Sequence, residues 1–336
     1  MDNLQISFGV IVSLVIVALL FDFMNGFHDA ANSIATIVST RVLKPHQAVI
    51  WASAFNFLAY FLFQLTVAKT IGKGTVDPSI VDHYIIFGAL IGAIIWNIVT
   101  WYYGIPSSSS HALIGGLVGA AIAKVGFSGL IMSGVLKIIA FIFIAPLLGF
   151  VIGGALMVIV SWLCRNIAPR KVDKYFRRLQ LLSAAAYSLG HGGNDAQKTV
   201  GIIWMLLVAA GISQASDAAP PSWVVISCYS AMGFGTMFGG WRIVKTMGNR
   251  ITKLNQARGF CANSGGAITL FMATALSIPV STTHTITGAI AGVGSTRGAR
   301  RVRWGVAGGI VWAWILTIPC SAVMAAMAWY VGTLVL

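Results

Sequence analysis

Residues 25–29, Asn25-Gly26-Phe27-His28-Asp29, interrupt an apolar stretch that extends from residue 4 to residue 40. A second long apolar stretch, residues 179–213, is interrupted in the same way by His191-Gly192-Gly193-Asn194-Asp195. Each stretch is longer than the about 20 helical residues that cross the hydrocarbon core of a membrane. A polar cluster with glycine inside such a stretch predicts an interrupted helix, so we expect a broken helix at both places.

The composition assigns the chain to the membrane proteins. Of its 336 residues, 57% are hydrophobic and only 9% are charged, whereas a soluble domain carries about 25% charged residues. The 22 Lys and Arg exceed the 8 acidic residues, and they gather in short loops between apolar stretches, which is typical of cytoplasmic loops. The sequence therefore predicts an all-α polytopic protein in a lipid bilayer, without a nucleic-acid partner.

The two polar clusters belong to an internal repeat. Positions 29 and 195 lie 166 residues apart, and a second pair of motifs, Pro-Ser-Ser-Ser-Ser-His at 106–111 and Pro-Val-Ser-Thr-Thr-His at 279–284, is separated by 173. The apolar stretches between these landmarks match in number and length. We therefore predict a first repeat at residues 1–162, a basic linker at 163–178 and a second repeat at 179–336.

Equivalent loops of the two repeats differ in charge in every comparison. Loop 242–258 contains five basic residues and no acid, whereas its counterpart, 69–83, balances two Lys with two Asp. By the positive-inside rule the repeats insert with opposite orientations, the 163–178 linker is cytoplasmic and both termini lie outside. Inverted repeats with interrupted helices are the organisation of many secondary transporters.

The motifs at 106–111 and 279–284 predict an anion site. In each, Pro and hydroxyl residues precede a helix of small residues, and the first N–H groups of a helix lack intrahelical partners. Free amides, the positive end of the helix dipole and added hydroxyl donors suit a tetrahedral oxyanion, whereas in the alternative interpretation the hydroxyl groups only cap or pack the helices. The candidate substrate ligands are Ser107, Ser108, Ser109, Ser110, Ser281, Thr282 and Thr283.

Asp29 and Asp195 are the candidate coupling residues. A carboxylate in hydrocarbon is costly, so each is expected to bind Na⁺, a divalent metal or a proton. Lys198 stands where the first repeat has Asn32, and its ammonium would balance Asp195 or attract an anion and would disfavour a metal cation; alternatively it snorkels to water. Asp22 is equally consistent with a functional and a structural role. The other coupling and secondary candidates are Asn32, Asn194, His28, His111, His191, His284 and Gln197.

These motifs resemble the paired signatures of the inorganic phosphate transporter (PiT) family. The matching segments are Gly26-Phe27-His28-Asp29-Ala30-Ala31-Asn32 and Gly192-Gly193-Asn194-Asp195-Ala196-Gln197-Lys198, and the family landmarks occur in order over nearly the whole chain. The resemblance implies symport of inorganic phosphate with Na⁺ or H⁺, a homodimer, and hydroxyl clusters at the tips of re-entrant helical hairpins. By motif match, Asp29, Asn32, Asn194 and Asp195 would line the coupling-ion region, and the hydroxyl groups would hold phosphate.

One departure from the family pattern bears on the coupling ion. Sodium-coupled relatives have Asn before the Asp and Asn three positions after it in both repeats, whereas here His28 precedes Asp29 and Lys198 follows Asp195. An ammonium in place of a neutral ligand argues against Na⁺ at the second site. The pattern resembles the bacterial low-affinity, proton-coupled branch, for which phosphate is expected to travel as a neutral complex with a divalent metal such as Mg²⁺.

We therefore predict a non-enzymatic transporter of a bacterial inner membrane that has no cofactor and imports phosphate by alternating access, with H⁺ favoured over Na⁺. Import of a dianion against 100 mV costs about 4.6 kcal/mol, so uptake requires accompanying cations or a neutralising metal. A permease for sulfate or another tetrahedral oxyanion is the alternative. A hydrolase using Ser110–His111 or Thr283–His284 is disfavoured, because adjacent residues of a helix do not face each other.

Overall fold

The computed structural model describes residues 7–214, 217 and 219–335. Within these residues the chain is almost entirely helical and has no strand, and five helices are long and apolar enough to cross a membrane: α1, α4, α5, α6 and α12. The predicted all-α membrane class is confirmed. The helices are α1 (Phe8–Ser39), α2 (Pro45–Leu58), α3 (Thr66–Gly74), α4 (His83–Tyr103), α5 (Ser109–Val125), α6 (Met132–Leu163), α7 (Pro169–Ala209), α8 (Ser222–Phe238), α9 (Trp241–Asn249), α10 (Gln256–Ala275), α11 (Thr282–Ser295) and α12 (Trp304–Val335).

The distribution of side chains is that of a protein surrounded by lipid. Large apolar side chains lie on the outside, for example Phe143 of α6 (57% exposed) and Trp312 of α12 (66% exposed). Ionisable groups lie inside, among them Asp29, Asp195 and Lys198, each at most 2% exposed. Polar groups in a membrane protein face the interior of the bundle, where they find partners, and such groups mark functional sites.

The second six helices follow the same order as the first six. A long helix (α1 or α7) is followed by two shorter helices, a helical hairpin and a 32-residue helix (α6 or α12). The two 32-residue helices each contain one internal proline, Pro146 and Pro319, whose separation of 173 positions equals that of the hydroxyl motifs.

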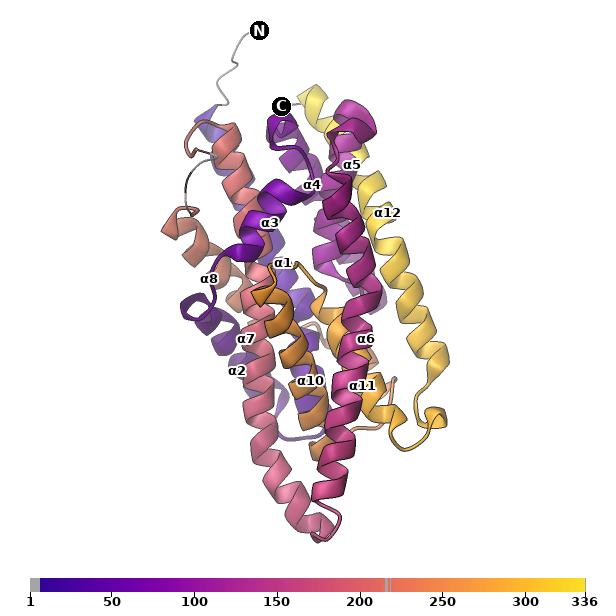
Figure 1. Ribbon diagram of the computed structural model, residues 1–336. Coiled ribbons are helices and arrows are strands. Elements are labelled where there is room, and N and C mark those ends of the chain that lie inside the picture. The colour runs from indigo at the N-terminus through magenta and orange to yellow at the C-terminus, as the bar shows by residue number, and fades with distance from the viewer. Residues whose placement is uncertain (1–6, 215–216, 218, 336) are drawn as a thin grey trace.

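The two hairpins approach each other from opposite ends of the molecule. The α4–α5 hairpin turns at residues 104–108 and the α10–α11 hairpin at 276–281, and both turns lie near the middle of the bundle (Figure 1). Each hairpin packs on the 32-residue helix of the other half, α4 and α5 on α12, and α10 and α11 on α6. Small residues permit this close packing, since a Cβ atom added to Gly92 of α4 would lie 2.6 Å from the Ala325 nitrogen of α12.

The predicted breaks at 25–29 and 191–195 are wrong. Helix α1 continues for 32 residues and α7 for 41 residues, straight through both clusters. Glycine inside a helix costs only about 1 kcal/mol, and Gly26 and Gly192 lie directly against the backbone of Met232 and Asn56. The polar side chains find partners on neighbouring helices, so the backbone has no need to unwind. The interruptions occur instead at the two hairpin turns.

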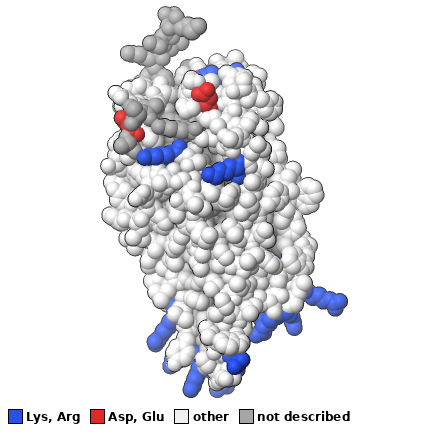
Figure 2. All heavy atoms as spheres, in the orientation of Figure 1, with Lys and Arg blue, Asp and Glu red and all other residues white. Residues whose placement is uncertain are grey.

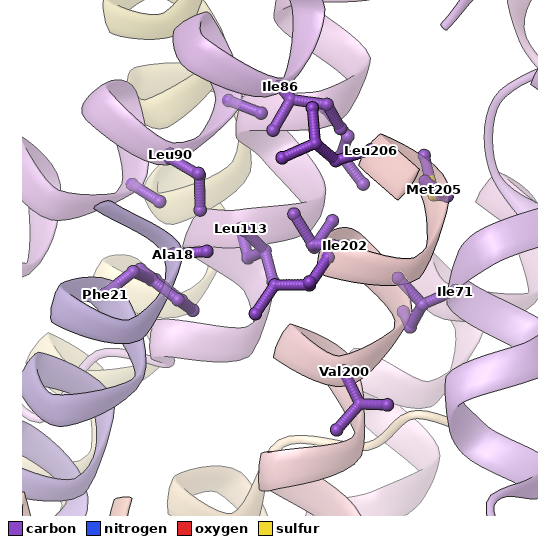
Figure 3. Packing of buried hydrophobic residues seen from close by; sticks show 14 of the residues in the cluster. Ala18, Phe21, Ile71, Ile86, Leu90, Leu113, Val200, Ile202, Met205 and Leu206 are labelled. Carbon is purple, nitrogen blue, oxygen red and sulfur yellow. The ribbon is translucent and has the colours of Figure 1, made fainter. Parts of the chain in front are cut away.

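Two apolar clusters lie on either side of the polar clusters. On α1, Phe21 and the buried apolar residues before it belong to the first cluster, whereas Ala31, Ile34 and Ile37 belong to the second. On α7 the order is reversed: Ala184 and Tyr187 belong to the second cluster, and most of the apolar residues from Val200 to Leu207 belong to the first. Figure 3 shows the first cluster, in which Phe21 of α1, Leu113 of α5 and Ile202 of α7 pack together. The polar centre is therefore enclosed between two apolar layers.

Basic side chains gather at one end of the molecule, which we call the basic end (segments 41–46, 163–178, 250–258 and 297–303). Figure 2 shows Lys and Arg crowded there and acidic residues only at the opposite end of the visible face. Hydrogen bonds link these segments to one another: Arg177 Nη2 donates to Arg41 O (3.2 Å), and Arg303 N donates to Ile251 O (2.9 Å). The predicted linker 163–178 is helical from Pro169 on, where α7 begins.

Candidate oxyanion and coupling site

The first hairpin tip contacts α1 through Ser109. The hydroxyl of Ser109 lies 2.6 Å from Asn25 Oδ1 and 2.7 Å from Asp29 Oδ2. Asn25 and Asp29 are four positions apart and therefore lie on the same face of α1. Both oxygen atoms are acceptors when Asp29 is ionised, and the serine hydroxyl has a single hydrogen, so it donates to one of them at a time. Helix α12 also holds this tip, because Trp314 Nε1 donates to Pro106 O (3.2 Å).

The second hairpin tip contacts both long helices. Asn32 Nδ2 of α1 donates to Thr282 Oγ1 (3.1 Å) and to Thr283 Oγ1 (2.9 Å). Thr282 Oγ1 in turn donates to Asp195 Oδ2 of α7 (3.1 Å), and Tyr187 Oη of α7 donates to Thr282 O (2.9 Å). The hydroxyl groups of this tip therefore lie between Asn32 and Asp195.

Lys198 joins the two tips. Its Nζ lies 2.5 Å from Asp195 Oδ1, 2.6 Å from Ser110 Oγ of the first tip and 2.7 Å from Val280 O of the second. The side chain is only 1% exposed, so it does not snorkel to water as the alternative interpretation had it. An ammonium has three hydrogens, and all three find an oxygen atom. The predicted approach of residues 107–110 to residues 281–283 is observed, with a fixed positive charge at the junction.

His191 lies beside Asp195 on α7 and is held there by Asn56 of α2. Thr236 Oγ1 donates to Met232 O (2.9 Å) and so accepts from Asn56 Nδ2 (2.9 Å), which turns Asn56 Oδ1 toward His191 Nδ1 (3.2 Å). An amide oxygen only accepts, so His191 Nδ1 carries a hydrogen. His191 Nε2 lies 3.4 Å from Asp195 Oδ2 and forms no hydrogen bond with any described residue.

A second imidazole–carboxylate pair lies in the first repeat. His28 Nδ1 is 2.7 Å from Asp29 Oδ1, and His28 Nε2 is 3.1 Å from Thr100 Oγ1 of α4. Thr100 Oγ1 also lies 3.0 Å from Trp96 O, to which its own hydrogen can be donated. Asp29 and Asp195 thus each lie beside one histidine, at 2.7 and 3.4 Å.

Several predicted site residues have structural contacts instead. Ser108 and Ser281 accept hydrogen bonds from the backbone of His111 and His284 (3.2 Å each) and cap α5 and α11. This is the helix-capping role of the alternative interpretation. Ser107, in contrast, has a buried hydroxyl with no hydrogen-bond partner among the described residues. It is the tip hydroxyl that is most available to a ligand.

Asn194 and Gln197 bind elements beside the junction, Asn194 at the turn of the second hairpin and Gln197 at the start of α3. Asn194 Nδ2 donates to Thr274 Oγ1 (3.1 Å), and Asn194 Oδ1 accepts from Val280 N (3.3 Å), so this residue holds the turn of the second hairpin. Gln197 binds the start of α3, accepting from Val67 N (3.0 Å) and donating to Gln64 O (2.9 Å). Both contacts are those of positioning residues.

His111 and His284 come together behind the tips. Their ring centroids are 4.7 Å apart, and His284 stacks on Trp314 at 3.9 Å. Both ring nitrogens of His111 lack a hydrogen-bond partner among the described residues. The two hairpins thus touch through one imidazole from each.

The sequence reasoning missed Asn25, Thr100 and Asn56 as partners of the site. Asn25 could have been found, because its spacing from Asp29 is one helical turn. Thr100 and Asn56 carry no local signal and become partners only through packing. Asp22, which the sequence left open, is fully buried and accepts from Thr199 Oγ1 of α7 (2.9 Å), one turn from Asn25.

One group of side chains has the composition of a cation site. Asp29, His191 and Asp195 each offer a ligand atom, and these atoms lie within 4.8 Å of one another. The fit to a metal is poor, however, because Lys198 and His28 already take one oxygen atom of each carboxylate. A cation that enters here competes with an ammonium.

The fold and the site define an all-helical membrane transporter whose polar centre is lined by hydroxyl groups. The family model described as "Phosphate transporter family" matches residues 25–169 and 164–325. A "Probable low-affinity inorganic phosphate transporter" of Rhizobium meliloti (strain 1021) is 59% identical over 98% of both chains. A protein of the same description from Bacillus subtilis (strain 168) is 46% identical over 95% of this chain and 96% of its own.

A solved structure has the same fold. It is entitled "The sodium-dependent phosphate transporter", is 26% identical, and superposes with a TM-score of 0.89 over 98% of this chain and all of its own. The chain therefore belongs to the phosphate transporter family. The predicted resemblance is confirmed, as is the expectation that the protein is a transporter and not an enzyme, with phosphate as the transported substrate.

Proposed function

We propose that the protein imports inorganic phosphate together with protons, and that the anion binds between the two hairpin tips. The observation that carries this proposal is the position of Lys198, whose ammonium lies between Asp195, Ser110 and Val280 O. It supplies the positive charge that an oxyanion needs and fills the space that a sodium ion would need. Ser107, Ser109, Ser110, Thr282, Thr283 and the Asn32 amide add neutral donors around it.

The charge balance of the centre favours proton coupling. Asp22, Asp29 and Asp195 are buried carboxyl groups, whereas Lys198 is the one buried ammonium among the described residues. Uncompensated buried charge is strongly unfavourable. Protons on the His28–Asp29 and His191–Asp195 pairs would reduce the excess negative charge before phosphate enters, and their release with phosphate would complete the cycle.

Sodium is the competing coupling ion. The relative of known structure is named a sodium-dependent transporter, and Asp29, His191 and Asp195 form a compact ligand group. Lys198 and His28 argue against sodium here, because each already occupies a carboxylate oxygen. A neutral complex of phosphate with Mg²⁺ is compatible with the same site, since it would carry its own counter-charge.

Alternating access would use the two apolar clusters as gates. The centre is closed toward both ends, with Ser109, Asp195 and Lys198 at most 1% exposed. Separation of the first cluster would open the site toward one side of the membrane, and separation of the second cluster toward the other. In these steps each of the repeats 1–162 and 179–336 would take up the conformation that the other had before. This fits the reversed order of the two clusters on α1 and α7.

The positive-inside rule places the basic end in the cytoplasm and the termini outside. For a bacterial protein this membrane would be the inner membrane. A homodimer is part of the same proposal. It would bury part of the apolar outer surface without changing the site within each protomer.

The test of coupling is uptake of labelled phosphate into proteoliposomes. We expect an inward proton gradient to drive accumulation without Na⁺ and a protonophore to abolish it. His191→Gln should abolish the response to the proton gradient, whereas His46→Gln, which alters an exposed histidine at the basic end, should not. Uptake that requires a Na⁺ gradient and is insensitive to the protonophore would refute proton coupling.

Sulfate is the alternative substrate. Phosphate can donate a hydrogen bond to a carboxylate, and fully ionised sulfate cannot. Asp29 and Asp195 lie at the tips, where such a bond would favour phosphate. Unlabelled sulfate should therefore compete poorly with labelled phosphate in the same vesicles.

A further inference from the structure

A pocket at the basic end is lined by six cationic side chains and no acidic one. It has a volume of about 390 Å³, and Asn249 and Thr252 complete its lining. We call it the basic pocket and define it by Lys253, Arg258, Arg297, Arg300, Arg301 and Arg303. Its size falls within the about 300–1,000 Å³ that is usual for small-ligand sites.

Hydrogen bonds within the protein fix the shape of the basic pocket. The two loops that form it are joined by hydrogen bonds from Arg303 N to Ile251 O (2.9 Å) and from Thr252 Oγ1 to Arg301 O (3.1 Å). Arg258 Nη1 donates to Lys253 O (2.7 Å), and Trp304 Nε1 donates to Ala299 O (2.8 Å). These bonds hold residues 250–258 and 297–303 around a common space.

The positive charges of the basic pocket have no ion-pair partner among the described residues. The sequence offers no partner nearby either, because no Asp or Glu follows Asp217. Like charges in one pocket repel each other. A bound anion would replace this repulsion with attraction to each of the cations. The linker 163–178 differs, since its basic residues are accompanied by Asp173.

We propose that the basic pocket binds a ligand that carries a phosphate group, distinct from the transported phosphate. Five of the six cations are arginines, whose planar guanidinium groups hold phosphate oxygens in pairs. Two sources share this chemistry: the headgroup of an anionic phospholipid and a soluble phosphate compound in the adjoining aqueous phase. Basic pockets beside membrane helices are suited to a lipid headgroup. The polar and charged lining of this pocket also suits a soluble phosphate compound.

The test compares two double variants of the full-length protein in nonionic detergent at fixed ionic strength. Arg300→Gln/Arg301→Gln removes two exposed charges of the basic pocket, and Arg170→Gln/Lys171→Gln removes two exposed charges of the same end outside it. The probes are short-chain phosphatidylglycerol and inorganic pyrophosphate, each titrated by calorimetry. We expect binding to weaken by at least about tenfold in the pocket variant and by less than about twofold in the control.

Each outcome either assigns the ligand of the basic pocket or overturns the proposal. Selective loss of phosphatidylglycerol binding assigns the basic pocket to a lipid headgroup, and selective loss of pyrophosphate binding assigns it to a soluble phosphate compound. Equal binding by the two variants, or no saturable binding of either probe to the unaltered protein, would overturn the proposal. Lys253→Gln serves as a second pocket variant if the first elutes as an aggregate. Comparison between variants removes any contribution of the transport site, which both retain.

Discussion

At the scale of single residues, Lys198 carries a positive charge that is buried in the centre of the molecule. Its ammonium is buried and depends on Asp195, Ser110 and Val280 O for all its hydrogen bonds. The sequence could predict that Lys198 pairs with Asp195, because they lie three positions apart on one helix. It could not predict the bonds to both hairpin tips, which depend on how the halves pack.

Removal of Lys198 separates its structural role from its role in transport. Lys198→Met leaves Asp195 buried without its main partner, so we expect the free energy of unfolding to fall by about 3–5 kcal/mol. In Lys198→Met/Asp195→Asn both charges are absent, and most of this stability should return. Phosphate uptake should be lost in both variants. Denaturant unfolding in detergent and uptake by proteoliposomes measure the two effects, and normal uptake by the double variant would exclude Lys198 from the anion site.

Two neighbouring serines distinguish substrate binding from helix capping. The Ser107 hydroxyl has no hydrogen-bond partner among the residues that the structure describes, so Ser107→Ala should leave stability unchanged. It should raise the KM for phosphate by about tenfold through loss of a charge-assisted hydrogen bond. Ser108→Ala removes the cap of α5 and should cost about 1 kcal/mol in stability with little change in KM. The same KM for both variants would contradict this assignment.

At the scale of elements, the hairpin turns take the place of the predicted broken helices. The sequence located the polar clusters and the hydroxyl motifs correctly, but glycine and polar residues inside an apolar stretch do not reveal whether the backbone unwinds. Here Gly26 and Gly192 serve close helix packing, and His28 and Asp195 form hydrogen bonds with Thr100 of α4 and Thr282 of α11. That information is tertiary and has no local sequence signal.

Close packing of the first hairpin on α12 can be tested at a glycine. Gly92→Ala places a Cβ atom 2.6–2.7 Å from Ala325, so we expect a loss of about 1–3 kcal/mol in stability from overpacking. Gly309→Ala on α12 is the control, because a Cβ atom there meets nothing within 4 Å. The control should be neutral or slightly stabilising, since alanine favours helix more than glycine does. Equal effects on unfolding in detergent would argue against this packing.

At the scale of the whole molecule, the charged loops and the two apolar clusters define an axis across the membrane. The loop charges, read from the sequence alone, predicted two halves of opposite orientation. In the structure, α1 and α7 meet the two clusters in opposite order, and the hairpins enter from opposite ends (Figure 1). Both observations are those that inverted repeats would produce, and the repeat bounds 1–162 and 179–336 stay a prediction. The closed centre could not be anticipated from loop charges.

The orientation of the molecule in the cell can be measured by cysteine labelling. In a variant without its four native cysteines, Ser79→Cys and Lys171→Cys place one exposed thiol at each end. We expect a membrane-impermeant maleimide to label position 79 in intact cells and position 171 only after the membrane is permeabilised. The opposite pattern would show that the positive-inside rule fails for this protein.

The most direct test of the central claim is the structure of the protein determined by electron cryomicroscopy at saturating phosphate. We predict tetrahedral density between the tips, within hydrogen-bonding distance of Ser107 and the ammonium of Lys198. Density for phosphate only at the basic end, with the tips closed on each other as they are here, would contradict the account.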